Sequence, residues 1–258
     1  MKIVAYWNGD IAGSIMAEWL REQDLGGDVQ LREFDHSLLY LESWGEELPE
    51  IMVVASRHRA ESGKPTLTCH VTGNFGGADY GGKQGHLQQG HALYLRESLQ
   101  ALQRARERHS LQHAVSFEVT HHGPTDLPFP LIFVEVGSCE EQWHDNVACQ
   151  AVAESILEIV RKEPSIVPTA IGFGGPHYAP NFTEALVASE IAFGHIAPKY
   201  AVDFINKAMI VQMIEKTVPK PELAILDWKG LKGEEKENIT GILDELGFGW
   251  KKTRDFKH

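Results

Sequence analysis

The sequence predicts an α/β fold built on a mixed, mostly parallel sheet with helices on both faces. Two observations lead to this prediction. Apolar runs of strand length alternate along the chain with longer amphipathic segments, and polar residues, mainly histidines, follow several of the strands directly. The 258 residues are enough to bury a sizeable core. We therefore expect a single α/β domain over residues 1–258.

The first half of the chain reads as a strand, a helix, two strands and a second helix. Residues 2–7, KIVAYW, predict a short buried strand, and the turn NGD then offers an N-cap for an amphipathic helix over residues 11–23. Residues 51–58 and 65–74 are rich in Val, Ile and Thr and predict further strands. Leucines at helical spacing predict a long helix over residues 87–109, whose basic end suits the helix dipole.

Two adjacent histidines follow the next strand, AVSFEVTH. Side chains alternate between the two faces of a strand, so this segment predicts that His121 and His122 point to opposite faces. The strand over residues 130–138 is apolar on both faces apart from Glu135, as expected of a central strand.

The sequence SCEE begins the next predicted helix. Ser138 and Glu141 have the spacing of a capping box, and the helix is expected to reach about Lys162 and to stop before Pro164. This segment therefore predicts one helix across most of residues 139–162.

The last third continues the alternation of strands and helices. Residues 169–183 begin as a strand and pass into a loop rich in Gly and Pro, and AFGHIAPKY is a second such segment. The helical stretch VDFINKAMIVQMIEK follows. A final strand, turn and helix end at Gly247, a plausible C-cap.

Composition excludes several function classes. The formal net charge of −12 argues against a general affinity for nucleic acid, although a local basic patch remains open. Three scattered cysteines indicate neither a disulfide framework nor a cysteine zinc site. No apolar run approaches the roughly 18 residues of a membrane span, and the first residues do not read as a signal peptide. We expect a cytoplasmic protein.

Histidines gather after the predicted strands, which predicts a shared site. The chain has 13 histidines, and imidazole is both a common metal ligand and the usual proton shuttle near neutral pH. Glu135 is costly inside a sheet unless it has a partner, and we expect a histidine or a metal ion to supply it. The alternatives are structural histidines with satisfied hydrogen bonds and a Glu135 that caps backbone amides.

The glycine-rich segments permit two interpretations. TGNFGGADYGGKQG matches no phosphate-binding motif, so it is a weak nucleotide signal and an equally good substrate-binding loop. GFGGPHYAP is expected to present His177 in a fixed orientation. Because no GxSxG elbow or reactive cysteine is recognisable, we expect a water molecule activated by a metal or a base, with a further His or Glu as proton acceptor.

Six blocks together resemble the archaeal and plant type of D-aminoacyl-tRNA deacylase, in the order that this family has them. They are SRHRAESGKPTLTCHVTGNFGGADYGG, SFEVTHHGPT, IFVEVGSCEEQW, AIGFGGPHYAPNFT, FGHIAPKY and LDWKG. The resemblance implies a cytosolic, monomeric, zinc-dependent hydrolase that cleaves the ester between a D-amino acid and the 3′ end of tRNA in translation quality control. It also implies a phosphorylase/hydrolase-like α/β fold.

Site residues are carried over on the matching positions. We predict Zn²⁺ bound by His121, Glu135 and His177, with His70, His122 and Glu118 as catalytic residues. The acceptor end of D-aminoacyl-tRNA is expected to contact a further set of residues and a basic rim. That set is Thr72, Asn74, His58, Gly123, Tyr178, His195 and Lys199, and the rim is Arg57, Arg59, Lys83 and Lys199.

Two other functions remain open at this point. One is a zinc-dependent exopeptidase or amidohydrolase acting on a small peptide or N-acyl amino acid. The other is a nucleotide- or RNA-binding module without enzymatic activity, in which the histidines are structural. Ester and amide substrates, offered with and without tRNA, separate these possibilities.

Overall fold

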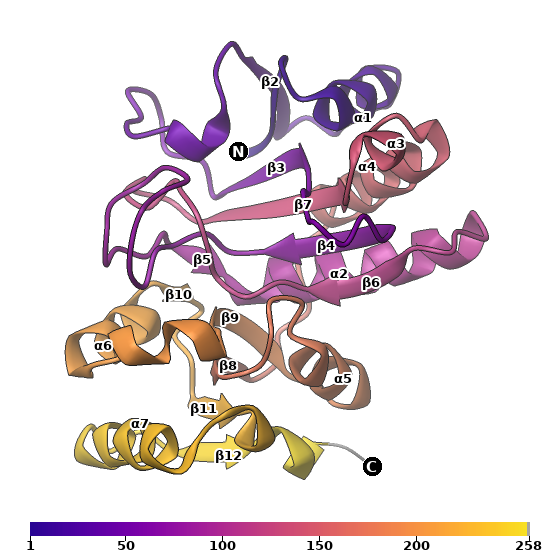
Figure 1. Ribbon diagram of the computed structural model, residues 1–258. Helices are drawn as coiled ribbons and strands as arrows, with labels where there is room; N and C mark the ends of the chain where they lie inside the picture. Colours follow the sequence, from indigo (N-terminus) through magenta and orange to yellow (C-terminus); the bar gives the residue numbers. More distant parts are fainter. Residues whose placement is uncertain (257–258) are drawn as a thin grey trace.

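The computed structural model describes residues 1–256, which form two main sheets placed one beyond the other (Figure 1). The six-stranded sheet has the order β2-β1-β3-β7-β4-β6 and the four-stranded sheet the order β12-β11-β8-β9. Among the described residues, neighbouring strands of these sheets are parallel except β4 and β7. The predicted α/β class with a mixed, mostly parallel arrangement is confirmed, with the strands divided between two sheets.

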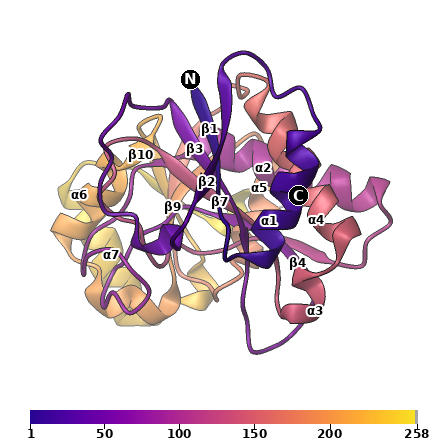
Figure 2. The ribbon, with the colours of Figure 1, turned by 90° about the horizontal axis from the view of Figure 1, so that it is seen from above.

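The first sheet carries helices on one face and loops on the other (Figure 2). Its strands are β1 (Lys2–Trp7), β2 (Val29–Phe34), β3 (Ile51–Arg57), β4 (Thr66–His70), β6 (Ala114–Phe117) and β7 (Leu131–Gly137). The helices on its covered face are α1 (Ile11–Arg21), α2 (Ala92–Arg108) and α4 (Asn146–Val160). On the opposite face, Leu38 and Leu41 from one loop and Leu127 and Phe129 from another pack on the strands.

The second sheet has helices on both faces. Its strands are β8 (Thr169–Phe173), β9 (Ala192–Ala197), β11 (Leu223–Leu226) and β12 (Trp250–Lys252). One face meets α2 and α5 (Pro180–Ala188), and the other meets α6 (Lys207–Glu215) and α7 (Gly233–Glu245). A short pair, β5 (Gly90–His91) with β10 (Thr217–Val218), completes the strands, and 3-10 turns cover Leu38–Tyr40, Lys199–Phe204, Trp228–Gly230 and Thr253–Phe256.

Helix α2 joins the two sheets into one packed body. It contacts β4 and β6 of the first sheet and β9 of the second, and the largest core cluster draws residues from both sheets. This shared core supports the single domain expected over residues 1–258, which stays a prediction. The last two residues of that range lie outside the described chain.

Two predicted helices differ from those observed. The helix expected from residue 87 begins at Ala92, because Gly90 and His91 pair with β10 instead. The helix expected over residues 139–162 is divided into α3 (Glu140–Trp143) and α4, since Asp145 caps a new helix with its carboxylate.

The capping box expected between Ser138 and Glu141 is wrong. Gln142 Oε1 accepts the backbone N–H groups of Ser138 and Cys139, while Ser138 Oγ donates to the Lys64 carbonyl at 2.6 Å. The box is therefore shifted by one residue and closed by an amide side chain. This leaves Ser138 to tie the end of β7 to the segment before β4.

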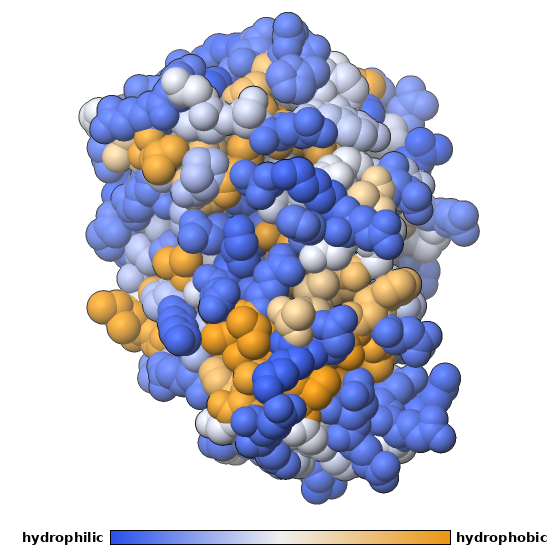
Figure 3. Space-filling model, turned by 90° about the vertical axis from the view of Figure 1, so that its left-hand side faces the viewer, coloured by the Kyte–Doolittle hydropathy of each residue, from blue (hydrophilic) through white to orange (hydrophobic). Residues whose placement is uncertain are grey.

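The face shown in Figure 3 is mostly hydrophilic, with apolar groups gathered mainly in the lower half of the view. Within residues 1–256, none of the helices has the length and apolar character needed to cross a membrane. The three cysteines are free thiols, in agreement with the absence of a predicted disulfide framework.

We predict that His91 makes stability fall in mild acid. Its Nδ1 accepts the Tyr94 N–H at the start of α2, and burial lowers the pKa of His91 to about 4. The unfolded chain, with an ordinary histidine pKa near ~6.5, binds the proton first, so stability present above that pH is lost as the pH falls towards 4. Urea unfolding should show that wild type loses about 2 kcal/mol more than His91→Asn between pH 7 and pH ~4.5.

Asparagine is the matched control in this comparison because it still caps the helix and does not titrate. Identical pH dependence for the two proteins would contradict the proposed role of His91.

Candidate active site

The loop-covered face of the first sheet changes from apolar to polar along its strands. On β3 the apolar Met52 and Val54 are followed on the same face by Ser56, and on β7 Phe133 is followed by Glu135. The register places Ser56 and Thr68 on either side of Glu135. Because helices cover only the other face, this polar row lies beneath loops and is the natural floor of a site.

The antiparallel strand β4 brings a histidine to the same floor. His70, at the carboxyl end of β4, pairs with Phe133 near the middle of β7, and their rings stack with centroids 5.4 Å apart. We expected the polar residues to meet at the shared carboxyl ends of parallel strands. That expectation is wrong for His70, because β4 runs opposite to β7.

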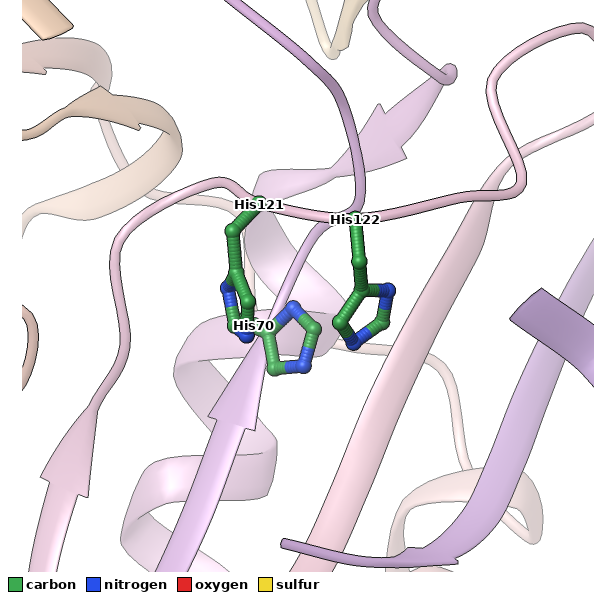
Figure 4. Close-up of side chains that lie close together, drawn as sticks. All are labelled: His70, His121 and His122. Atoms are coloured by element: carbon green, nitrogen blue, oxygen red, sulfur yellow. The ribbon is translucent and has the colours of Figure 1, made fainter. Parts of the chain in front are cut away.

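The two adjacent histidines both turn towards His70, as Figure 4 shows. The prediction that they point to opposite faces is wrong because β6 ends at Phe117, so strand alternation no longer applies at residues 121 and 122. His122 has a left-handed backbone with φ of 45°, a conformation uncommon for a residue with a side chain, and its carbonyl accepts the Gly73 N–H. The His70 ring centroid lies 4.3 Å from that of His121 and 4.8 Å from that of His122.

These three imidazoles share one tautomer. Each Nδ1 lies within hydrogen-bond distance of a main-chain carbonyl, for His70 that of Val71 at 3.1 Å, for His121 that of Val119 at 2.8 Å and for His122 that of Gly123 at 2.7 Å. A carbonyl only accepts, so each Nδ1 carries the proton, and a ring that is neutral keeps a lone pair on Nε2. Burial opposes the charge of His70, but the neighbouring Glu135 outweighs burial and raises the pKa of His70 above its usual value. One ligand atom from each ring lies within 4.8 Å of the others.

Two buried carboxylates face these lone pairs. His70 Nε2 lies 3.7 Å from Glu135 Oε2 and has no hydrogen-bond partner among the described residues. His121 Nε2 lies 3.5 Å from Glu118 Oε2. Acceptor atoms that face one another out of solvent need a proton or a cation between them. The donor set therefore fits a metal ion.

Glu118 also holds a second group of side chains. His177 Nε2 donates to Glu118 Oε2 at 2.7 Å, and His58 Nδ1 lies 3.1 Å from the other carboxylate oxygen. On its far side, His58 Nε2 lies 3.0 Å from the Tyr178 hydroxyl. His58, Glu118 and His177 form another set with ligand atoms within 4.8 Å, and so do His70, Glu118 and Glu135. The predicted zinc set of His121, Glu135 and His177 is not among these groups and stays a prediction.

Electrostatics divides the cluster into charged and neutral members. Burial raises the pKa of Glu118, but the His177 hydrogen bond and the charge of His58 outweigh it and bring the pKa to about 2. Burial likewise opposes the charge of His58, whose pKa the two carboxylates raise to about 10. Burial and the neighbouring His70 lower the pKa of His122 to about 4 and hold that of His121 well below its usual range. His121 and His122 are thus neutral and ready to act as ligands.

A cavity of about 1120 Å³ opens above the cluster. His58, His121, His122, Glu135 and His177 line it, whereas Glu118 and His70 lie fully buried behind these residues. The arrangement offers a reacting group access to imidazoles, while the Glu118 carboxylate behind them is shielded from the cavity. This is the environment in which proton transfer and polarisation by a cation are effective.

Four predicted substrate-binding residues have other surroundings. Thr72 Oγ1 donates to the Pro124 carbonyl at 2.6 Å and Asn74 Nδ2 to the Gly81 carbonyl at 2.8 Å, so both buried side chains hold loops together. His195 is buried with Nδ1 3.2 Å from Thr120 Oγ1, and neither it nor the exposed Lys199 lines the cavity. Their roles as substrate contacts stay predictions.

The other predicted contacts lie closer to the cluster. Tyr178 contacts His58, and Gly123 follows His122, where a Cβ would lie 2.3 Å from the Leu39 carbonyl oxygen. Of the predicted basic rim, Arg57 and Arg59 line the cavity, while Lys83 pairs with Asp126.

Sequence reasoning missed Trp7, Asp10 and Trp143, which also line the cavity. Asp10 was recognised only as the N-cap of α1, a role that the structure confirms. Its second oxygen also accepts the Ser56 hydroxyl at 3.1 Å. The one available signal was an aspartate at the carboxyl end of a predicted first strand.

An α/β fold with histidines and buried carboxylates gathered under an open cavity fits a hydrolase. Comparison with known proteins identifies the family. The profile of the family described as D-aminoacyl-tRNA deacylase matches residues 46–251, and the chain belongs to this family. The six sequence blocks that predicted it lie within the matched range, and the predicted family is confirmed.

Relatives match over most of their length. The D-aminoacyl-tRNA deacylase of Thermococcus kodakarensis is 42% identical over 202 residues, which cover 77% of this chain and 72% of the relative. That of Korarchaeum cryptofilum is 36% identical over 254 residues, covering 95% and 90%. A crystal structure of a conserved protein of unknown function has a TM-score of 0.91 and 29% identity, and the match covers 100% of this chain and 96% of that one. The whole fold is therefore shared with a solved structure.

We predict that Thr72→Val lowers the free energy of unfolding by about 1–2 kcal/mol, because it keeps the shape of the buried side chain but removes the hydrogen bond to the Pro124 carbonyl. Thr72→Ser keeps the hydroxyl and is the matched control for that bond. Denaturant unfolding measures both. Equal stability of wild type and Thr72→Val would contradict the role of Thr72 in holding this loop.

Proposed function

We propose that this chain hydrolyses the ester bond between a D-amino acid and the 3′ end of tRNA with a water molecule activated above the buried cluster. Family membership supports the substrate class and the ester hydrolysis. One observation carries the mechanism. The imidazoles of His70, His121 and His122 converge on one point, and those of His70 and His121 face two carboxylates.

The three histidines would hold a zinc ion. Three neutral imidazoles, each oriented by a hydrogen bond from its other nitrogen, are a ligand set that zinc favours in catalytic sites. When bound, the ion acts as a Lewis acid that polarises a carbonyl group and lowers the pKa of water. This assignment keeps His121 from the set predicted from sequence and replaces Glu135 and His177 with His70 and His122.

His177 is the best placed general base. It donates its Nε2 proton to Glu118, so a neutral His177 has its lone pair on Nδ1, and its side chain is 34% exposed. Nδ1 lies 3.4 Å from the Tyr200 hydroxyl at the outer side of the cluster. In this role Glu118 orients the imidazole and stabilises the charge that the imidazole gains on taking a proton from water.

His58 and Tyr178 are suited to stabilise the negative charge that develops on the ester oxygen. His58 is held as a cation by Glu118 and Glu135, and its Nε2 can donate to the Tyr178 hydroxyl at 3.0 Å. The phenolic proton is then free to point towards the substrate. Such preorganised donors lower the barrier because they need no reorientation as charge builds up.

We predict that His121→Ala slows the release of tyrosine from D-Tyr-tRNA at least about 100-fold and that wild type acts on D-Tyr-tRNA far faster than on L-Tyr-tRNA. The matched control is His109→Ala, which removes a histidine that directly follows α2 and pairs with Glu154 of α4. Release of labelled tyrosine measures all of these rates. Equal rates on both enantiomers would contradict a role in proofreading.

The metal assignment makes a separate prediction. Elemental analysis should find zinc in wild type and in His177→Ala, and little zinc in His70→Ala or His122→Ala, because only the last two remove a proposed ligand. His177→Ala should nevertheless have lost most of its activity. Loss of zinc from His177→Ala, with zinc retained in His70→Ala, would instead favour the ligand set predicted from the sequence.

Amide substrates test the alternative hydrolase. A zinc exopeptidase or amidohydrolase would cleave small peptides or N-acyl amino acids without tRNA, whereas the proposed function requires the ester. We also propose that the protein is cytoplasmic and monomeric. Light scattering in solution tests the monomeric state.

A further inference from the structure

Arg57 has an unusual place in the wall of the cavity. It is the last residue of β3 and directly precedes His58 of the cluster. Its guanidinium lies over two indole rings, with the central carbon 5.7 Å from the centroid of Trp7 and 4.9 Å from that of Trp143. Both tryptophans line the same cavity. The planar guanidinium group is therefore confined between aromatic side chains and is not free to sweep through solvent.

Hydrogen bonds fix the position of this clamp, which consists of Arg57, Trp7 and Trp143, relative to the histidine cluster. The buried Asp10 carboxylate accepts the Arg57 backbone N–H at 3.0 Å, and its other oxygen accepts the Gly13 N–H at 2.9 Å. On the other side, Trp143 Nε1 donates to the His58 carbonyl at 2.8 Å. The clamp is thus attached to the backbone of both α1 and β3, immediately beside the proposed catalytic histidines.

The N–H donors of the Arg57 guanidinium are available to bind a ligand. Within residues 1–256, the Arg57 side chain has neither a hydrogen bond nor an ion pair to the protein. Every other arginine except Arg59 forms an ion pair with a carboxylate or donates to a main-chain carbonyl. Those paired arginines are Arg21, Arg32, Arg96, Arg104, Arg106, Arg108, Arg161 and Arg254. The two unpaired guanidinium groups both line the cavity.

An anion with two oxygens spaced to accept paired hydrogen bonds is the ligand that such a group selects. A guanidinium forms paired hydrogen bonds with two oxygens of a phosphate, and one held between indoles has already lost much of its conformational freedom. The chain carries a net charge of −12, so an anionic substrate needs a local cation at the cavity. In the proposed substrate, the anion nearest to the ester is the phosphodiester on the 5′ side of the terminal adenosine.

We infer that Arg57, clamped between Trp7 and Trp143, binds this phosphodiester and so sets the terminal nucleotide in register with the ester. The inference rests on the proposed function and names the group of the substrate that the cavity recognises. The rival ligand is a carboxylate, such as the free end of a peptide.

Two minimal esters test the inference. D-tyrosine is attached to the 3′ oxygen of adenosine or of adenosine 5′-monophosphate, and kcat/KM is measured for each. Wild type should prefer the phosphorylated ester by about tenfold, the worth of one charge-assisted contact. Arg57→Met should bring the ratio of the two kcat/KM values close to one, and Arg57→Lys should retain only part of the preference. Arg161→Met removes an exposed arginine at the end of α4 and should keep the wild-type ratio.

The ratio of the two kcat/KM values distinguishes recognition of the phosphate by Arg57 from a purely structural role of Arg57. If Arg57→Met slows both esters equally and the preference survives, Arg57 acts through Trp143 and His58, and the inference is overturned. No preference in wild type overturns it as well.

Ligand binding tests the role of Arg57 even if no catalysis is detected. If wild type releases tyrosine from neither D-Tyr-tRNA nor the esters, the proposed function is lost, while binding of adenosine 5′-monophosphate and of adenosine still tests Arg57. Quenching of tryptophan fluorescence should show about tenfold tighter binding of the monophosphate to wild type and no such difference for Arg57→Met. Arg57-dependent binding of N-acetyl-D-tyrosine in its place would identify a carboxylate site and overturn the inference.

Discussion

Two ionised carboxylates buried under the sheet face are the constraint on which this site depends. Glu118 and Glu135 are almost fully inaccessible, and a buried charge is tolerated only when opposite charge and hydrogen bonds surround it. The cationic His58 lies beside both carboxylates, and His177 donates a hydrogen bond to Glu118. These two histidines thus stabilise the carboxylates beneath them, in addition to the roles proposed for them in hydrolysis.

The sheet provides the room for this cluster by leaving one face without helices. On the covered face, α1, α2 and α4 pack on Val and Ile side chains. On the other face, loops pack tightly only over the apolar end of the strands. The end that carries Ser56 and Glu135 stays open, because loops that follow the surface can part where a packed helix cannot.

Two local departures from regular structure complete the site. The reversal of β4 places His70 beside the middle of β7, and the left-handed backbone at His122 turns a second and a third imidazole towards it. A residue with a side chain in that conformation persists only when its surroundings hold it, and the hydrogen bond from Gly73 to the His122 carbonyl is part of that support. Thr72 holds the same loop through its hydrogen bond to the Pro124 carbonyl. A residue predicted to contact the substrate thus supports the loop that carries the histidines.

The sequence alone determined the alternation of elements, the α/β class, the family and most of the residues that meet at the site, because each of these follows from local periodicity or from contiguous blocks of residues. Glu135 was correctly expected to need a polar partner, since its apolar neighbours on the strand exclude water. Only the tertiary structure decided which donor atoms converge. The direction of β4, the turn at His122 and the clamp of Trp7 and Trp143 around Arg57 depend on contacts between segments distant in the chain, and no local pattern encodes them.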